Sequence, residues 1–215
     1  FFCPKLASSN ANEFDDVIFY NKDNYNLNLH QIKELSKIDS ELSSVIDRFT
    51  KDDFTVDGKN KVWCTDFTYM RQPNGKFRYN CSIIDLYDRS AVASLNSNYI
   101  NTDLAIETLK KALEQEHYPE VILHFDQGVQ FTSRDFVNFC KNNNVTQSMS
   151  KAGCPYDNAP MERFYNTFKS NFYNVTSFSS VEMMDELTMK YINWYNYVRP
   201  HSYNNYLTPM EARYS

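Results

Sequence analysis

A change in the pattern of apolar residues, about a quarter of the way along the chain, limits the fold more than any other feature. Before it, residues 28–49 carry apolar side chains at helical spacing, and residues 50–60 form a polar stretch that we interpret as a linker. After it, residues 62–70 separate into two alternating sets, as the two faces of a β-strand do. The chain therefore divides into a short N-terminal part and a longer C-terminal part with strands.

The longer part, residues 59–215, is predicted to contain three strands followed by alternating helices and strands. Pro, Asn and Gly at 73–75 mark a hairpin turn between the first two strands. The later elements are predicted at 76–86 and 91–96 (strands), 102–116 (helix), 121–125 (strand), 133–142 (helix), 145–148 (strand), and 158–173 and 180–198 (helices). Hairpin strands pair antiparallel, and later strands join by helical crossovers. The predicted fold is α/β, a mixed five-stranded sheet with helices on both faces.

The shorter part, residues 1–58, is predicted to be a helical or partly irregular appendage that ends in a linker. It is also the acidic part of the chain. Residues 1–60 hold 7 basic and 11 acidic residues, whereas residues 61–215 hold 15 and 16. Surfaces that bind nucleic acid are normally basic, so this appendage is a poor candidate for recognising DNA.

The cysteines and the apolar runs bound the compartment. Five cysteines are present, which is an odd number, and none forms a C-x-x-C pair. This argues against a disulfide framework and fits a reducing cytosol. Four scattered histidines give no zinc-site spacing. No apolar run reaches the length of a membrane span and no signal peptide is recognisable. We therefore predict a cytoplasmic protein with no membrane partner.

Two aspartates occupy positions that invite an explanation. Asp66 lies in the middle of the first strand, where burial is costly unless the acid is paired or binds a metal. The alternative is an edge strand with Asp66 facing solvent. Asp126 directly follows the apolar strand 121–125, at the strand end where α/β sheets collect ligands. It fits equally well as a turn residue before Gly128.

Glu162 belongs to the helix predicted at 158–173, which Asp157 or Asn158 can cap. One arc of this helix is apolar and contains Met161, Phe164, Phe168, Phe172 and Val175. Glu162 and Lys169 fall on the opposite arc, two turns apart. That arc is either an ordinary solvated face or a face that presents chemistry.

Together the three acids fit a metal site better than each fits alone. Magnesium prefers oxygen ligands and takes few of them from protein. Two such ions about 4 Å apart can activate a nucleophile and stabilise the leaving oxygen in phosphoryl transfer. Two strand acids and one helix acid can converge at one edge of a sheet to hold them.

Four runs of sequence, in this order, resemble one known family. They are residues 63–69 (WCTDFTY), 124–133 (HFDQGVQFTS), 148–164 (SMSKAGCPYDNAPMERF) and 191–209, which contains YINWYNYVRPH and LTP. The chain is similar here to the DDE transposases of bacterial insertion sequences, which share the retroviral integrase core. Thirty-five residues separate Asp126 from Glu162, as is characteristic of that group. The resemblance covers about residues 59–213.

The resemblance implies a ribonuclease H-like fold and a catalytic set of Asp66, Asp126 and Glu162. These would hold Mg²⁺ or Mn²⁺, with two ions expected. Lys169 matches a basic position that contacts DNA near the site. Tyr156 and Asn158, with Asp157 between them, match a loop that approaches the substrate and are predicted DNA contacts.

The implied reaction is DNA transposition. Water attacks a phosphodiester at the end of the mobile element and frees a 3′-OH, which then attacks a phosphate of the target DNA. No covalent bond to the protein is needed. The implied partners are element-end and target DNA and further copies of the chain, which would form a homo-oligomer on DNA. The expected location is the bacterial cytoplasm, at the nucleoid during the reaction.

Some positions depart from the family pattern. Phe125 stands where a small residue is usual, so packing beside Asp126 is expected to differ. The larger departure is the acidic N-terminal segment, since relatives usually carry a basic helix-turn-helix there. We interpret it as a truncated or diverged appendage. Two alternatives to a transposase follow. One is a domesticated or decayed relative that binds DNA or protein without catalysis, and the other is a nuclease that hydrolyses DNA without joining it.

Overall fold

The computed structural model describes residues 56–150 and 158–215. The predicted N-terminal segment lies outside them except for its last three residues. Its helical character and its boundary with the larger domain therefore stay predictions. Tyr156 and Asp157 also lie outside the described residues.

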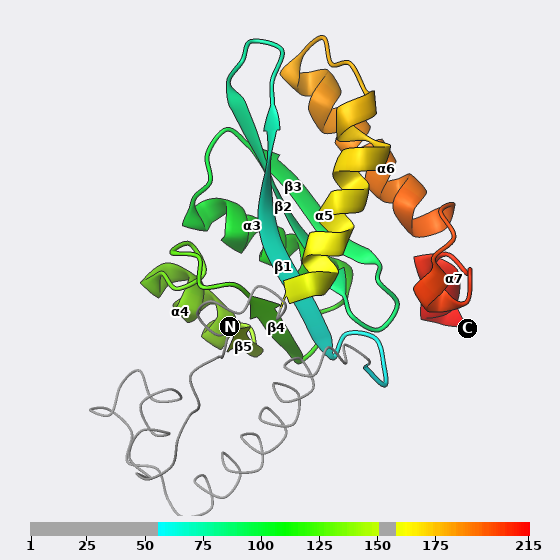
Figure 1. Cartoon of the computed structure of the whole chain (residues 1–215). Helices are drawn as coiled ribbons and strands as arrows, with labels where there is room; N and C mark the ends of the chain where they lie inside the picture. Colours follow the sequence, from blue (N-terminus) through cyan, green and yellow to red (C-terminus); the bar gives the residue numbers. More distant parts are fainter. Residues whose placement is uncertain (1–55, 151–157) are drawn as a thin grey trace, which may run out of the picture. The chain divides into compact units, whose positions relative to one another are not determined.

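A five-stranded mixed sheet forms the centre of the described domain (Figure 1). Its strands are β1 (Val62–Arg71), β2 (Phe77–Asp85), β3 (Ala91–Ser97), β4 (Val121–Phe125) and β5 (Val145–Met149). They lie in the order β3-β2-β1-β4-β5. The β1–β2 and β2–β3 pairs are antiparallel, and the β1–β4 and β4–β5 pairs are parallel. The predicted α/β class and mixed five-stranded sheet are confirmed.

Helices lie on both sides of this sheet, as predicted (Figure 1). They are α3 (Thr102–Gln115), α4 (Arg134–Asn142), α5 (Ala159–Asn171), α6 (Val181–Tyr197) and α7 (Pro209–Tyr214). Side-chain caps explain several starts, because Asn101, Ser133 and Ser180 each accept a backbone N–H in the first turn. Within the described ranges, no helix is both long enough and apolar enough to cross a bilayer.

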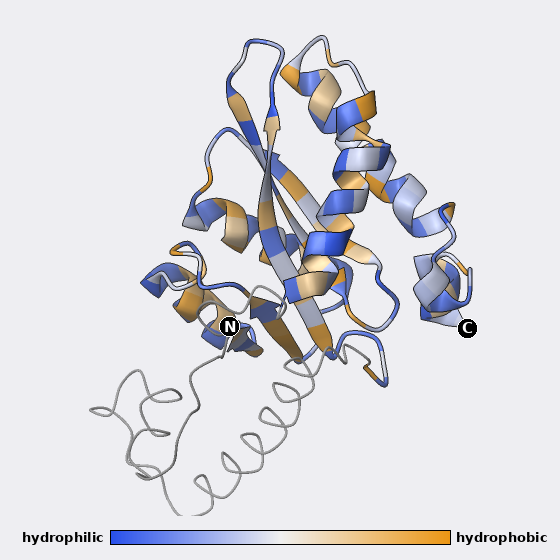
Figure 2. Cartoon of the chain, in the orientation of Figure 1, coloured by the Kyte–Doolittle hydropathy of each residue, from blue (hydrophilic) through white to orange (hydrophobic). Residues whose placement is uncertain are grey.

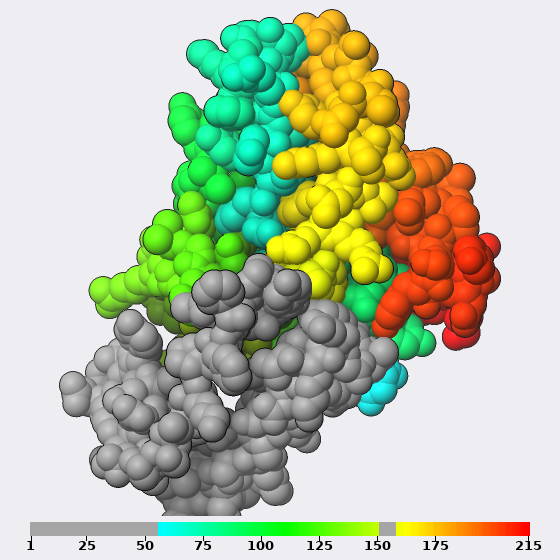
Figure 3. All heavy atoms as spheres, viewed as in Figure 1, coloured from blue at the N-terminus to red at the C-terminus, as the bar shows by residue number. Residues whose placement is uncertain are grey.

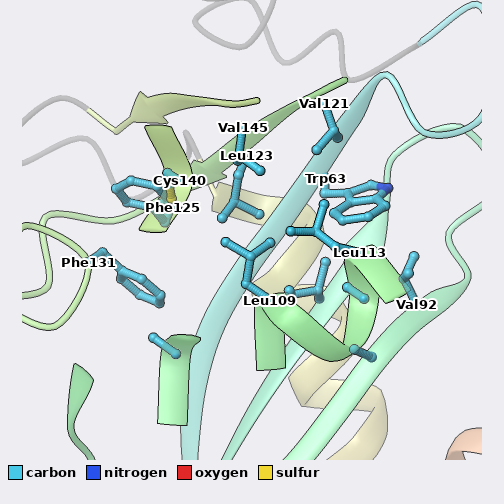
Figure 4. Close-up of a cluster of buried hydrophobic side chains, with 14 of the residues drawn as sticks. Trp63, Val92, Leu109, Leu113, Val121, Leu123, Phe125, Phe131, Cys140 and Val145 are labelled. Carbon is cyan, nitrogen blue, oxygen red and sulfur yellow. The ribbon is translucent and has the colours of Figure 1, made fainter. Parts of the chain in front are cut away.

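The main core fills the space between the sheet and helices α3 and α4 (Figure 4). Trp63, Leu109, Leu113 and Leu123 have no exposed surface. Phe125 is also fully buried, and its ring centroid lies 5.0 Å from that of Phe131 in a stacked pair. The large side chain that departs from the family pattern is thus absorbed by an aromatic cluster behind Asp126.

Two expectations about the C-terminal helices were wrong in detail. Helix α5 ends at Asn171, and a 3-10 turn, η2 (Tyr173–Val175), follows it. Val175 was placed on the buried arc but is 71% exposed, because the tighter turn rotates it away from the core. Helix α7 was not predicted. Thr208 and Glu211 form a capping box at its start.

Candidate active site

The register of two parallel strands brings the two predicted aspartates together. Cys64 on β1 is paired with His124 on β4, at the last position where these strands are in register. Asp66 and Asp126 each lie two residues beyond that pair, so they occupy neighbouring positions where the two strands diverge. Because β1 lies between β2 and β4, the alternative of an edge strand for Asp66 is wrong.

Asp66 is half-buried and electrostatically strained. The pKa of its carboxyl is raised to about 7, mainly by burial and also by the nearby Asp126 and Glu162 carboxylates. The backbone N–H of Phe67, which donates to Asp66 Oδ1 at 2.7 Å, and the Lys169 ammonium act in the opposite direction. Asp126 and Glu162 therefore both lie within electrostatic range of Asp66.

Asp126 is exposed and is held by the turn that follows it. The backbone N–H of Gly128 donates to Asp126 Oδ1 at 3.0 Å. A Cβ atom on Gly128 would lie only 3.0 Å from the same oxygen. The backbone of Gly128 is not left-handed, so glycine is favoured here by the limited space beside Asp126.

Glu162 is exposed in the first turn of α5, and two contacts fix that turn against β1. The Tyr165 hydroxyl donates to the carbonyl oxygen of Asp66 at 2.8 Å. The Asn158 amide Nδ2 donates to the carbonyl oxygen of Thr65 at 3.3 Å. Polar and apolar residues alternate along α5 (Figure 2). The apolar face is buried, as predicted for Met161 and its neighbours, and leaves Glu162 exposed.

The predicted DNA contacts have different surroundings. Lys169 is half-buried, and its Nζ lies 4.7 Å from the centre of the Tyr69 ring. Asn158 is only 6% exposed and precedes α5 without a side-chain cap, contrary to the cap expected from the sequence. Its hydrogen bond to Thr65 positions the helix, and a role in binding DNA stays a prediction for Asn158. Tyr156 lies outside the described residues.

Two supporting residues were missed in the sequence. His124 is buried on β4, and its ring nitrogens lie 3.0 Å from Ser148 Oγ and 3.2 Å from Ser150 Oγ. These contacts hold the end of β5 beside the end of β4, where Asp126 follows. Tyr165 is the other, since its hydroxyl also lies 3.2 Å from Asn80 Oδ1. A histidine inside an otherwise apolar strand was the available signal for the first, whereas the tyrosine gave none.

We call Asp66, Asp126 and Glu162 the triad. Across residues 56–150 and 158–215, no three His, Cys, Asp or Glu side chains lie close enough together to coordinate a metal ion as they stand. In the same ranges, no ion pair involves a member of the triad. The donors nevertheless suit a hard cation, because they are carboxylate oxygens whose mutual repulsion a cation would relieve.

Two family models match the part of the chain that forms this site. Two models of the integrase core domain match the chain, one over residues 56–155 and the other over residues 143–209. Together they cover the whole sheet and the helices up to the start of α7. Strands β1 and β4 and helix α5, which position the three acids of the triad, all lie inside the matched residues.

Curated relatives agree with these models. Transposase InsF for insertion sequence IS3A of Escherichia coli (strain K12) is 35% identical over 167 residues, which is 77% of this chain and 58% of that protein. The transposase for insertion sequence element IS904 of Lactococcus lactis subsp. lactis (strain IL1403) is 34% identical over 160 residues, 74% of this chain and 63% of that protein. This chain therefore spans about three fifths of the length of these relatives.

Solved structures share the fold. The HTLV-2 integrase catalytic core domain in complex with magnesium, in its trimeric form, superposes with a TM-score of 0.56 at 15% identity, covering 73% of this chain and 97% of that one. A chain of the simian T-cell lymphotropic virus intasome in complex with PP2A regulatory subunit B56 gamma gives a TM-score of 0.60 at 16% identity, covering 74% of this chain and 55% of that one. The predicted ribonuclease H-like fold is confirmed.

Proposed function

The chain belongs to the integrase core family, alongside the transposases of bacterial insertion sequences, and from this premise we propose that it is a transposase that cuts and joins DNA strands. One observation carries the proposal. The register of β1 and β4 gives Asp66 and Asp126 neighbouring positions, Glu162 on the anchored helix α5 lies within electrostatic range of Asp66, and no ion pair in the described domain neutralises the three.

We assign the triad as the ligands of Mg²⁺ or Mn²⁺, with two ions expected. When bound, these ions would supply Lewis-acid activation of the attacking oxygen and would offset charge on the scissile phosphate. The triad residues hold this position because β1, β4 and α5 are fixed to one another by the register and by the Tyr165 and Asn158 contacts. A magnesium-bound relative of the same fold supports the choice of cation.

The reaction that suits this site has two displacement steps at phosphorus. In the first, water attacks a phosphodiester and the 3′ oxygen leaves as a 3′-OH. In the second, that 3′-OH attacks a phosphate of the target strand, and the oxygen of the broken target bond leaves. The Lys169 ammonium would hold the DNA backbone beside the triad by its charge. No side chain needs to act as nucleophile.

The partners follow from the reaction. Element-end DNA and target DNA are the substrates, and the place of action is the bacterial nucleoid in the cytoplasm. Both ends of an element must be brought together, so we propose that the chain acts as a homo-oligomer on DNA. The intasome that shares the fold supports this. The predicted contact at Tyr156 belongs to this proposal too.

A strand-transfer assay tests the proposal. Full-length chain is incubated with labelled element-end DNA, a target plasmid, and Mg²⁺ or Mn²⁺. We expect joined product from the wild type and none from Glu162→Gln. Glu182→Gln is a matched control, because Glu182 is an exposed acid in the first turn of α6, and it should join normally.

Two other outcomes would replace the proposal. A folded wild type that yields no product with either metal would support the second candidate, a decayed relative that binds without catalysis. The acidic charge of residues 1–60 is the observation that favours that candidate. Hydrolysed ends without joined product would instead indicate a nuclease.

A further inference from the structure

A row of aromatic and basic side chains follows the β1–β2 hairpin and is linked to the triad through Lys169. The Lys169 ammonium lies 4.7 Å from the centre of the Tyr69 ring. The Tyr69 and Phe77 rings meet edge to face with centres 5.5 Å apart, and the Arg71 guanidinium lies 6.0 Å from the centre of Phe77. We call Lys169, Tyr69, Phe77 and Arg71 the hairpin strip.

The strip is accessible and continuous with the site. Tyr69 is 59% exposed and Phe77 is 45% exposed. Side chains of α5 meet those of the β1–β2 hairpin along the face shown in Figure 3. The Tyr173 hydroxyl, just after α5, donates to the carbonyl oxygen of Arg71 and so ties the far end of the strip to the helix that carries Glu162. Lys169 belongs to both, because its charge also acts on Asp66.

Two physical features indicate what this surface binds. Large aromatic rings left half in water with cations beside them fit a ligand that offers both flat apolar faces and negative charge. Single-stranded nucleic acid offers both, because each base has a face for stacking and each phosphate a charge. Duplex DNA offers the charge, but its base faces are already stacked on one another.

We propose that the hairpin strip is a binding site for the unpaired bases of a parted DNA end, held next to the triad by stacking on Tyr69 and Phe77 and by charge from Lys169 and Arg71. This inference rests on the proposed function and adds a subsite to it. Tyr69 and Arg71 lie three and five residues beyond Asp66 on β1, or about 10 and 17 Å along the strand. The strip would therefore hold bases a few nucleotides from the reacting phosphate.

A fluorescence measurement tests the strip without any need for catalysis. The probe is a duplex with a five-nucleotide single-stranded tail that contains 2-aminopurine, whose emission falls when it stacks. Full-length chain is titrated into this probe and into the blunt duplex, with EDTA present to prevent cleavage. We expect the wild type to quench the tailed probe. Tyr69→Leu combined with Phe77→Leu should abolish quenching and weaken binding of the tailed probe about tenfold, with little change for the blunt duplex.

Matched variants separate stacking from other effects. Tyr69→Phe keeps the ring and should quench normally. Tyr214→Leu removes an exposed tyrosine with a similar lysine contact, since Lys59 Nζ lies 4.6 Å from its ring, and should also quench normally. Arg71→Gln should still quench. It should lower the salt dependence of binding by the amount expected for the loss of about one phosphate contact. If the double variant proves unstable on heating, each single leucine variant is measured instead.

The outcomes distinguish this inference from the proposed function. Quenching that survives loss of both rings, or a wild type that does not quench, overturns the strip whatever the strand-transfer assay shows. Equal loss of affinity for tailed and blunt DNA also overturns it, because stacking would then not be the cause. If quenching depends on Tyr69 and Phe77 but the chain never joins DNA, the strip is supported and the transposase assignment is wrong.

Discussion

Two sets of acids in this domain have the same composition, two aspartates and one glutamate, and opposite surroundings. Asp85, Asp88 and Glu116 converge on the guanidinium of Arg213, at 2.9, 2.5 and 2.6 Å. Arg213 is 4% exposed, and both aspartates are fully buried. The triad has no such partner in the described domain, and burial together with mutual repulsion raises the pKa of Asp66.

The difference shows how a fold separates structural from functional charge. Buried charges are tolerated when they are paired and hydrogen-bonded, and the Arg213 cluster, as we call Arg213 with its three acids, satisfies that condition internally. A set of acids left without an internal cation costs stability. It persists where an external cation is part of the function. Substitutions in the two sets should therefore have opposite effects on strand transfer, on thermal stability and on stabilisation by added metal.

The largest expected effect is loss of joining when a triad acid is neutralised. Asp66→Asn, Asp126→Asn and Glu162→Gln should each reduce strand transfer by at least about 10²–10³-fold, because each removes a ligand and a charge from the site. The melting temperature should stay the same or rise, since repulsion within the triad falls. Strand-transfer and thermal unfolding measurements on the same preparations test both halves. Full joining by any one variant removes that residue from the triad.

The reverse pattern is expected for the Arg213 cluster. Arg213→Met leaves Asp85 and Asp88 buried without their cation and should reduce the free energy of unfolding by about 3–5 kcal/mol. The melting temperature should fall by roughly 6–20 °C. Glu186→Gln is the control, because it removes an exposed ion pair with Lys190 and should leave the melting temperature unchanged. A stable Arg213→Met variant would mean that the cluster does not hold the domain together.

Added metal should discriminate between the two sets. At about one hundred times its dissociation constant, Mg²⁺ should stabilise the wild type by about 2.7 kcal/mol, and EDTA should reverse the shift. Asp126→Asn should lose most of this shift, since it lacks a ligand. Glu116→Gln, which alters the Arg213 cluster, should retain it. Calorimetric unfolding with and without metal measures the effect, and a shift that persists in Asp126→Asn would place the ion elsewhere.

The contrast also shows what the sequence could reveal. The order of strands and helices along the chain followed from apolar periodicity, because each element buries one face against the same core. The triad was predicted from an acid in the middle of a strand, an acid just after another strand, a two-faced helix and a family spacing. The Arg213 cluster was not found, since Arg213 and Asp85 are 128 residues apart and Arg213 belongs to an unpredicted helix of six residues. Local pattern carries no signal for a contact that only the folded chain creates.

The same reasoning explains the errors near the site. Val175 was placed in the core by extending one helical period past the point where α5 ends, and helix ends are set by local turns and tertiary contacts that periodicity does not see. Asn158 was one of the two residues expected to cap α5, but its amide donates to β1 and makes no cap. The neighbouring positions of Asp66 and Asp126 depend on the register of β1 with β4, which no sequence spacing specifies.

A smaller effect is expected where the backbone supports the triad. Gly128→Ala places a Cβ 3.0 Å from Asp126 Oδ1 and 3.3 Å from Gln130 Oε1, so the carboxylate must shift by a few tenths of an ångström. We expect strand transfer to fall about tenfold, in line with the sensitivity of reacting groups to small misplacement, with an unchanged melting temperature. Gly58→Ala is the control, because its nearest neighbour is the flexible end of Lys61 at 3.4 Å. Equal activity in both variants would show that Asp126 has room to move.

The smallest effect is a pH dependence at the end of the domain where Arg213 lies. Burial, together with the charge of Arg199, lowers the pKa of His201 to about 4 in the folded state. The ordinary histidine pKa is about 6.5, so between these values the unfolded chain binds more protons than the folded one. Stability from His201 is therefore complete above about pH 6.5 and is lost as the pH falls toward 4.

Unfolding by urea across this pH range tests the effect of His201. The free energy of unfolding should decline less steeply with acid for His201→Gln than for the wild type. His117→Gln, at an exposed histidine, should follow the wild type. An unchanged decline in His201→Gln would show that His201 is not the cause of the acid sensitivity.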